Sequence, residues 1–217
     1  MDGMGQENMK LLIIGATGLV GRHVLEKALA DNRITSIVAP GRRELAVHPK
    51  LHSPIVDFDC LPESAGWWQA DSMICTLGTT IRVAGSQEAF RHVDYGYPLA
   101  AGRLAKSHGT PTFVLTSAIG ANVHSRFFYN RVKGEVERDL ARIGFESLTF
   151  VRPGLIGGKR DRARTMETAL GVFKAILDPV LPRRYRTNPA GLIAEKLLQA
   201  AISAQPGIHI VTSEEMV

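Results

Sequence analysis

Short apolar runs alternate along the chain with longer segments in which apolar residues recur every three or four positions. The short runs predict buried strands, and they cover residues 10–15, 34–39, 54–58, 72–77, 112–117, 147–152 and 208–211. The longer segments predict helices over residues 19–30, 87–107, 127–142 and 189–204. Strands that are apolar throughout belong in a parallel sheet with helices on both faces. The pattern therefore predicts a doubly wound, Rossmann-type α/β fold.

Three of the predicted helices carry further signals. Pro98 lies inside the helix over 87–107 and predicts a kink there. Asn188 suits the N-cap of the helix over 189–204, because its side chain can accept a hydrogen bond from the first turn. In the helix over 127–142, the glutamate, lysine and arginine side chains are assigned to the exposed face.

One segment interrupts the alternation of strands and helices. Residues 154–187 are rich in arginine and proline, and we expect them to form a small C-terminal cap over the carboxyl edge of the sheet. The polar residues 1–9 are expected to be a flexible leader. No linker-like stretch separates two parts of the chain, so we predict a single domain over residues 1–217.

Composition narrows the classes of protein that the chain can belong to. Apolar residues make up 45% of the 217 and the net charge is +5, which excludes disordered and fibrous classes. No apolar run approaches the roughly 18 residues of a membrane helix, so no membrane association is expected. The start lacks the features of a signal peptide, and the two cysteines, Cys60 and Cys75, suit a reducing compartment. These features predict a cytoplasmic location.

Other polar residues carry weaker signals. Seven histidines show no metal-ligand spacing, so no metal is expected. Basic groups at 159–164 and 183–186 raise nucleic acid as a partner, but acidic and apolar residues interrupt them. We interpret them as a solvated rim or a site for an anionic small-molecule substrate, with no nucleic acid bound. Assembly as a homodimer is left open.

A glycine-rich turn follows the first predicted strand and opens the first predicted helix. Gly15, Gly18 and Gly21 have the spacing GxxGxxG. In such a turn the first glycine permits the tight bend, the second lets a phosphate approach, and the third allows close helix–strand packing. Backbone N–H groups of the turn and the helix end, at Thr17, Leu19 and Val20, would bind a pyrophosphate. The turn predicts dinucleotide binding.

The end of the second strand distinguishes between the two nicotinamide dinucleotides. An NAD site usually has a carboxylate there for the ribose 2′-hydroxyl, whereas this chain has Arg42 and Arg43 and no carboxylate before Glu44. Guanidinium groups can hold a 2′-phosphate in bidentate fashion. We therefore expect NADP(H) to be preferred over NAD(H). The alternative is a solvated loop with incidental arginines.

Tyr129 and Lys133 are the candidate catalytic pair. They are four residues apart in a predicted helix, so the phenol and the ammonium share one helical face. A neighbouring cation favours phenolate and lowers the pKa of a tyrosine, which suits a group that gives or takes a proton during hydride transfer. The alternative is an amphipathic helix with a packed Tyr129 and a solvated Lys133.

Several motifs in order resemble the atypical short-chain dehydrogenases/reductases (SDRs) of the Tat-interacting-protein-like subgroup, and more distantly the NmrA-like and epimerase-like SDRs. The match runs from about residue 10 to residue 158. Its motifs are Gly15–Gly21, Gly41–Arg43, Val56–Phe58, Cys75–Thr80, Val93–Asp94, Phe128–Glu137 and Arg152–Gly154.

The resemblance implies roles for further residues. Asp57 would contact the adenine amino group, Leu77, Gly78 and Thr79 would line the cofactor, and the backbone of Pro153 would approach the nicotinamide carboxamide. Lys133 would also bind the nicotinamide ribose. A serine or threonine at the end of the fifth strand would hold the substrate oxygen. Adjacent strand residues face opposite sides, so only one of Thr116 and Ser117 can face the ligand. We choose Ser117, which lies nearer the carboxyl edge, and keep Thr116 as the alternative.

Two departures from the resemblance matter. Asp94 stands where many extended SDRs have asparagine, which puts their usual proton relay in doubt. The chain also lacks the large C-terminal substrate domain of sugar epimerases. The leading prediction is an NADP(H)-dependent oxidoreductase with Ser117, Tyr129 and Lys133 as catalytic residues and a small carbonyl or alcohol as substrate. The alternatives are a catalytically silent NADP(H)-binding regulatory protein and an epimerase- or dehydratase-like SDR.

Overall fold

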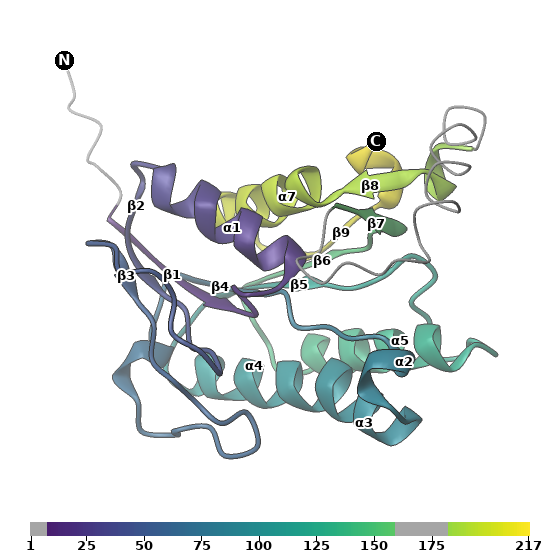
Figure 1. The fold of residues 1–217 in the computed structure, drawn as a ribbon, viewed down its shortest axis with the longest axis horizontal. Coiled ribbons are helices and arrows are strands. Elements are labelled where there is room, and N and C mark those ends of the chain that lie inside the picture. The colour runs from purple at the N-terminus through teal and green to yellow at the C-terminus, as the bar shows by residue number, and fades with distance from the viewer. Residues whose placement is uncertain (1–7, 159–181) are drawn as a thin grey trace.

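The computed structural model describes residues 8–158 and 182–217. Its centre is a seven-stranded sheet with the order β3-β2-β1-β4-β5-β6-β9, in which every neighbouring pair is parallel (Figure 1). The strands are β1 (Met9–Ile14), β2 (Ile34–Val38), β3 (Leu51–His52), β4 (Ser72–Cys75), β5 (Thr112–Thr116), β6 (Ser147–Val151) and β9 (Gly207–Val211). The predicted Rossmann-type fold is confirmed.

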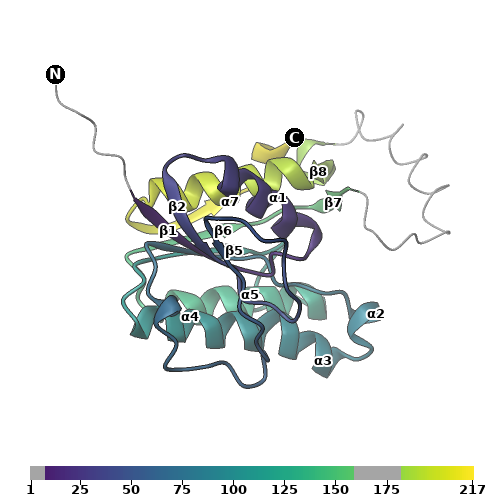
Figure 2. The same cartoon turned by 60° about the vertical axis from the view of Figure 1, so that its left-hand side comes forward.

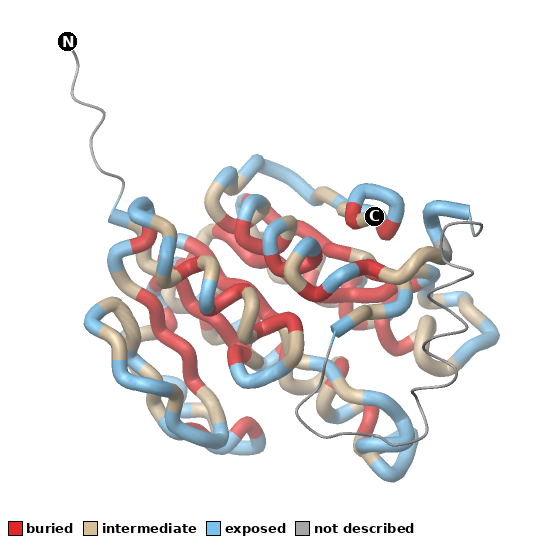
Figure 3. Tube along the Cα trace, turned by 45° about the horizontal axis from the view of Figure 1, so that its top comes forward, coloured by how far each residue is buried: buried red, intermediate tan, exposed pale blue. Residues whose placement is uncertain are grey.

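Helices cover both faces of the sheet. Helices α1 (Leu19–Ala30) and α7 (Ala190–Ser203) lie on one face, and α4 (Tyr97–Ser107) and α5 (Phe128–Ala141) lie on the other (Figures 1 and 2). Alternate residues of the central strands pack into two separate cores, one on each face of the sheet. In β5, Val114 packs in the core under α1 and α7, whereas Phe113 and Leu115 pack in the core under α4 and α5. Figure 3 shows the buried residues concentrated along the strands and the inner sides of the helices.

The sheet order places two loops beside each other. The chain runs outward from β1 to β2 and β3, and then returns to β4 on the other side of β1. Ligands of doubly wound sheets bind at this reversal, outside the carboxyl ends of the strands. The loops that follow β1 and β4 both lie there.

The predicted third strand is displaced. Only Leu51 and His52 form β3, and residues 54–58 make no regular strand, although Gly41 and Ile55 form an isolated bridge. Pro54 has no N–H to donate to a sheet ladder, which ends the regular pairing. The prediction of a strand over 54–58 was wrong.

The predicted helix over 87–107 divides into three parts. α3 (Gln87–Arg91) and α4 are joined by a π-helical turn, His92–Gly96, through which the backbone remains in the right-handed helical region. The irregularity is this π-helical turn, which ends two residues before Pro98 in the first turn of α4. The turn places Asp94 inside the protein, with 1% of its surface exposed.

The carboxyl edge carries elements that the pattern did not reveal. α2 (Ile81–Ala84) follows β4, and β7 (Leu155–Gly157) pairs in parallel with β8 (Thr187–Pro189) (Figure 2). The predicted cap over 154–187 is described only at these two ends, because residues 159–181, with the basic group at 159–164, lie outside the described residues. Of the predicted leader, residues 1–7 also lie outside them, and Met9 already belongs to β1.

Asn188 has another role than the predicted helix cap. Pro189 is the N-cap of α7, and Asn188 is fully buried in β8. Its amide accepts from the Gly154 N–H at 2.6 Å and donates to the carbonyls of Ser213 and Met216 at 2.9 and 3.2 Å. It therefore joins the base of the cap to the C-terminal turn. No helix in the described part of the chain has the length and apolar character needed to cross a membrane.

Candidate active site

The glycine turn has the backbone geometry that dinucleotide binding requires. Gly15 has a φ of +88°, and a Cβ there would lie 2.9 Å from the Leu77 backbone N. A Cβ on Gly21 would lie 2.1 Å from the Gly15 carbonyl oxygen, so α1 can pack against the turn only with glycine at this position. A Cβ on Gly18 would meet only that oxygen, at 3.3 Å. The space above Gly18 is therefore open.

The start of α1 presents unused donors to that space. Gly18 is the N-cap, makes no side-chain capping bond, and no acidic residue lies in the first turn. The first intrahelical bond runs from the Arg22 N–H to the Gly18 carbonyl. The N–H groups of Leu19, Val20 and Gly21 precede it, as the unpaired donors of a helix N-terminus do. Such donors, with the positive end of the helix dipole, suit a pyrophosphate.

A pocket continues from the glycine turn to the end of β2. Residues 15–17 of the turn share it with residues 39–43, and Leu45, Phe58 and Leu77 complete its lining. The exposed side chains of Arg42 and Arg43 lie on this pocket. The structure thus brings the predicted pyrophosphate-binding turn and the predicted 2′-phosphate arginines to one site. A dinucleotide fits the chemistry of these donors.

Asp57 lies near this pocket in a tight turn. One of its carboxylate oxygens accepts the Asp59 N–H at 2.9 Å. Asp59 in turn accepts from the Tyr97 hydroxyl at 2.9 Å and lies 2.5 Å from His92 Nε2. Burial and the Asp59 carboxylate raise the pKa of Tyr97. The adenine-binding role of Asp57 stays a prediction.

A buried ion pair lies under the loop that follows β4. Lys133 Nζ is 2.8 Å from Asp94 Oδ1, and the two side chains are 4% and 1% exposed. Burial is the largest single influence and would lower the pKa of Lys133, but the negative charges of Asp94, Tyr129 and Cys75 together outweigh it and the pKa is raised. Asp94 Oδ2 also accepts the Thr79 N–H at 2.8 Å, and a Cβ on Gly78 would lie 3.4 Å from Oδ1. The ion pair thus fixes the predicted cofactor loop to α5.

Tyr129 begins the same face of α5, one turn before Lys133. Its half-buried ring packs against Phe90 with centroids 5.4 Å apart. The Tyr129 oxygen is near enough to Lys133 that the negative charge of its ionised form raises the pKa of the ammonium. In the described ranges, 8–158 and 182–217, no hydrogen bond engages the Tyr129 hydroxyl. The predicted pair is therefore close in space, and Lys133 is not the solvated residue of the alternative interpretation.

Ser117 and Thr116 turn to opposite faces of the sheet. Ser117 is buried on the α5 side and donates to Glu137 Oε1 at 2.5 Å. Thr116 alternates with it and therefore faces the α1 and α7 side. Its Oγ1 is buried and makes no hydrogen bond with any residue that the structure describes. Of the two candidates, Ser117 lies on the face of Tyr129 and Lys133.

Sequence reasoning missed two residues beside Ser117. Glu137 was assigned to the exposed face of its helix, but its side chain is 7% exposed and accepts two hydrogen bonds from Arg152. The signal was available, because Tyr129, Lys133 and Glu137 recur every four residues along one helical face. Pro153, the next residue after Arg152, is buried, and its carbonyl accepts the Ile119 N–H at 2.8 Å. Its contact with a nicotinamide stays a prediction.

No cluster of potential metal ligands occurs among the described residues. The arginines of the second basic group, 183–186, lie at a short 3-10 turn, Arg183–Tyr185, just before β8. A substrate role for this group stays a prediction.

The chain is similar to known proteins in sequence and in fold. Protein HTATIP2 of Rattus norvegicus is 36% identical over 166 residues, which cover 74% of this chain and 68% of that protein. The fmp52 protein of Aspergillus fumigatus is 35% identical over 210 residues, covering 90% and 88%. The fungal relatives are named as mitochondrial proteins, which contradicts the predicted cytoplasmic location. No family model matches the chain.

Solved structures support the fold at low sequence identity. MoeE5 in complex with UDP-glucose and NAD has a TM-score of 0.71 and 14% identity, covering 93% of this chain and 74% of MoeE5. A short chain dehydrogenase family protein from Francisella tularensis has a TM-score of 0.66 and 13% identity, covering 96% and 98%. With the sequence relatives, these likenesses confirm the predicted resemblance. The chain belongs to the HTATIP2 and FMP52 family of atypical, NAD(P)-binding short-chain dehydrogenases/reductases.

Proposed function

We propose that the protein is an NADP(H)-dependent oxidoreductase that interconverts a small carbonyl compound and its alcohol. The observation that carries the proposal is the buried Lys133–Asp94 ion pair. It keeps a cation one helical turn from Tyr129, at the carboxyl edge where the glycine turn and the loop after β4 meet. A buried cation beside a phenol is what a proton-transferring tyrosine needs.

Each residue has a separable role in this proposal. Bound NADP(H) supplies hydride chemistry at C4 of its nicotinamide. Reduction of a carbonyl then requires a proton at the substrate oxygen, which Tyr129 gives from its hydroxyl and takes back in the reverse reaction. Lys133 stabilises the phenolate that remains. Because an ammonium has three donors and Asp94 accepts only part of them, Lys133 can also bind a ribose hydroxyl.

Arg42 and Arg43 support the choice of NADP(H). They share one pocket with the glycine turn, and no carboxylate lies between them and the end of β2. A 2′-phosphate would find two guanidinium groups there, whereas a ribose 2′-hydroxyl would find no acidic acceptor.

A catalytically silent NADP(H)-binding regulator is the second candidate. The observation that favours it is the lack of any hydrogen bond between Tyr129 and Ser117 in the described part of the chain, since Ser117 bonds Glu137 instead. Such a protein would bind NADPH and oxidise none of it, whichever carbonyl compound is offered.

Tyr129→Phe tests the proposal. NADPH oxidation is measured across a panel of aldehydes, ketones and quinones with the unmodified protein and this variant. The variant removes only the hydroxyl, so NADPH affinity should be unchanged while turnover falls by about 10²- to 10⁴-fold. Tyr95→Phe is the matched control, because the Tyr95 hydroxyl donates to Asp139, away from the site. No turnover in the unmodified protein, or turnover indifferent to Tyr129→Phe, would overturn the proposal.

A further inference from the structure

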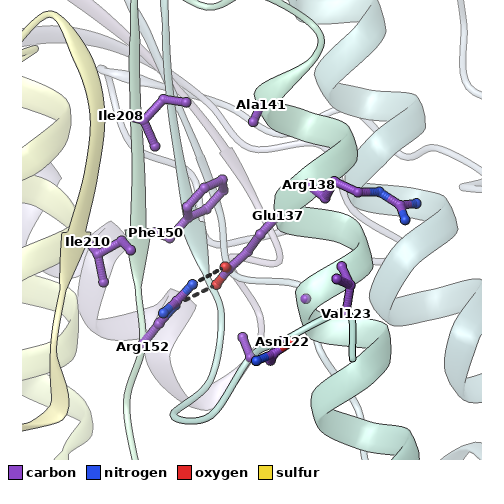
Figure 4. Close-up of a pocket in the computed structure, with 11 residues that line it drawn as sticks. Asn122, Val123, Glu137, Arg138, Ala141, Phe150, Arg152, Ile208 and Ile210 are labelled. Atoms are coloured by element: carbon purple, nitrogen blue, oxygen red, sulfur yellow. Dashed lines mark hydrogen bonds and ion pairs between the residues drawn. The ribbon is translucent and has the colours of Figure 1, made fainter. Parts of the chain in front are cut away.

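Ser117, Glu137 and Arg152 form a closed set of hydrogen bonds between β5, α5 and the end of β6. The Ser117 hydroxyl donates to Glu137 Oε1 at 2.5 Å. Arg152 donates from Nε to Oε1 at 2.9 Å and from Nη2 to Oε2 at 2.5 Å. Figure 4 shows the Arg152 guanidinium and the Glu137 carboxylate facing each other, the carboxylate on α5 and the guanidinium just after the end of β6. Both carboxylate oxygens of Glu137 are occupied.

The charge of Glu137 determines which way the serine proton points. A carboxylate can only accept hydrogen bonds, and that of Glu137 accepts from the bidentate guanidinium as well as from Ser117. Ser117 has one proton to donate, and it is committed to Glu137. Among the residues that the structure describes, Glu137 is the one hydrogen-bond partner of the Ser117 hydroxyl. The serine oxygen can therefore only accept a hydrogen bond from a group that meets it on the cofactor side.

The pair also lies between Ser117 and solvent. A cavity of about 330 Å³ opens between α5 and the strands β6 and β9, and its lining includes Glu137, Arg152, Phe150, Ile208 and Ile210 (Figure 4). Arg152 is 27% exposed, whereas Glu137 is 7% exposed. Solvent therefore reaches the Arg152 guanidinium. The Glu137 carboxylate, which lies between the guanidinium and the Ser117 hydroxyl, is almost fully buried.

We propose that Glu137 is a positioning residue that makes Ser117 a hydrogen-bond acceptor for the reacting oxygen, so that the site binds the alcohol form of its substrate in preference to the carbonyl form. The inference rests on the proposed oxidoreductase function. An alcohol hydroxyl has a proton to donate to Ser117, and a carbonyl oxygen has none. Arg152 acts one step further away, by holding the Glu137 carboxylate in its orientation.

A structural role alone accounts less well for the arrangement. Buried ion pairs often contribute little net stability, because the cost of desolvating both charges offsets their attraction. A pair whose only task is packing needs no contact with the candidate catalytic hydroxyl. Here Glu137 Oε1 accepts a hydrogen bond from Ser117, and Glu137 lies on the same helical face as Tyr129 and Lys133.

A kinetic double-mutant cycle separates the two roles. Ser117→Ala, Glu137→Gln and the double variant are compared with the unmodified protein by kcat/KM for the best alcohol and carbonyl pair of the substrate panel. Glu137→Gln should lower kcat/KM by about ten- to a hundredfold, and should have almost no further effect once Ser117 is alanine. Glu135→Gln is the matched control: it makes the same change on the same helix, at an ion pair with Arg91. Its kinetics should be unchanged.

A second readout tests the preference for alcohol. Glu137→Gln replaces one of the two acceptor oxygens by a donating NH2 group and so weakens the hydrogen bond that holds the Ser117 proton. The KM for the alcohol should therefore rise about tenfold relative to the KM for the carbonyl compound. Glu137→Met/Arg152→Met removes both charges and keeps the measurement possible if the single variant unfolds. This double variant should shift the relative KM in the same direction, because it also removes the acceptor of the Ser117 proton. It leaves no unpaired buried charge.

The outcomes distinguish this inference from the proposed function. Turnover that depends on Tyr129, with additive effects of Ser117→Ala and Glu137→Gln or equal losses for alcohol and carbonyl, would overturn the role of Glu137 alone. Absence of turnover in the unmodified protein would overturn both. Non-additive effects together with the relative shift in KM would support the inference.

Discussion

Asp94 sets the charge state of Lys133 at the buried end of the candidate site. Its carboxylate is the largest of the nearby negative charges that together outweigh the desolvation of the ammonium, and its second oxygen accepts the Thr79 N–H. Asparagine at this position could still accept from Thr79 but could not neutralise Lys133. The departure from the extended SDR pattern therefore gives the chain a buried ion pair in place of a neutral relay residue.

Asp94→Asn should destabilise the protein, because it leaves the buried ammonium of Lys133 without a counter-charge. Removing one partner of a buried pair typically costs about 3–5 kcal/mol. Urea unfolding at pH 7 measures the change. Asp31→Asn is the control: it breaks an ion pair with the 58% exposed Arg33, for which about 0–1 kcal/mol is expected. Equal losses in the two variants would contradict the account of Asp94.

The cost of Asp94→Asn should depend on pH. The pKa of Lys133 is raised in the folded protein, so the folded state holds its proton more tightly than the unfolded state does. The contribution is fully present below the unfolded lysine pKa of about 10.4. It is lost as pH rises through the higher folded pKa. The difference in unfolding free energy between the unmodified protein and Asp94→Asn should therefore be constant at neutral pH and shrink as the pH rises above about 10.4.

Arg42 and Arg43 should determine the choice of cofactor. Charge-assisted hydrogen bonds to a 2′-phosphate should make the Kd for NADPH at least about tenfold lower than that for NADH for each arginine engaged. Arg42→Ala/Arg43→Ala should raise the Kd for NADPH and leave that for NADH unchanged, as measured by calorimetry. Arg142→Ala, in an exposed pair with Asp139, is the control. Equal Kd values for the two cofactors in the unmodified protein would rule out this role.

At the scale of elements, the strand–turn–helix unit of β1 and α1 separates folding from binding. Gly21 is needed for packing, because a Cβ there would lie 2.1 Å from the Gly15 carbonyl. Gly18 has a φ of −76°, which other residues adopt, and faces open space. Substitutions at these two glycines should therefore have different consequences.

Gly18→Val should abolish NADPH binding without unfolding the protein. Its side chain would stand over the first turn of α1, where the pyrophosphate is expected. Calorimetry should detect no NADPH binding, and urea unfolding should give a free energy within about 1 kcal/mol of the unmodified protein. Gly21→Ala should instead lower the unfolding free energy. Unchanged NADPH binding by Gly18→Val would show that the dinucleotide site lies elsewhere.

Local signals predicted most elements, and long-range contacts account for most of the differences. Tyr129 and Lys133 could be placed on one face because a spacing of four fixes it. The same spacing places Glu137 on that face, but its partner Arg152 at the end of another strand could not be predicted from the local pattern. The burial of Asp94 by the π-helical turn likewise could not be predicted, because Asp94 pairs with Lys133 on another helix. Pro54 shifted the third strand, although proline's missing donor was visible in the sequence.

At the scale of the whole molecule, topology brings together residues that the sequence keeps far apart. The glycine turn, Arg42 and Arg43, the loop after β4, and Tyr129 with Lys133 come from four different parts of the chain. They meet because parallel strands end at one edge of the sheet and because the order reverses beside β1. This convergence follows from strand order, which the alternation of apolar segments could predict. The pattern of apolar segments does not indicate the cellular compartment, and the predicted cytoplasmic location was wrong.

The most direct test of the oxidoreductase proposal follows the hydrogen itself. NADPH deuterated at C4 is incubated with the protein and the carbonyl panel, and the products are analysed by mass spectrometry. The proposal predicts an alcohol that carries one deuterium on the former carbonyl carbon, formed at least a hundredfold more slowly by Tyr129→Phe. A protein that binds the cofactor while no labelled alcohol forms from any member of the panel would contradict it.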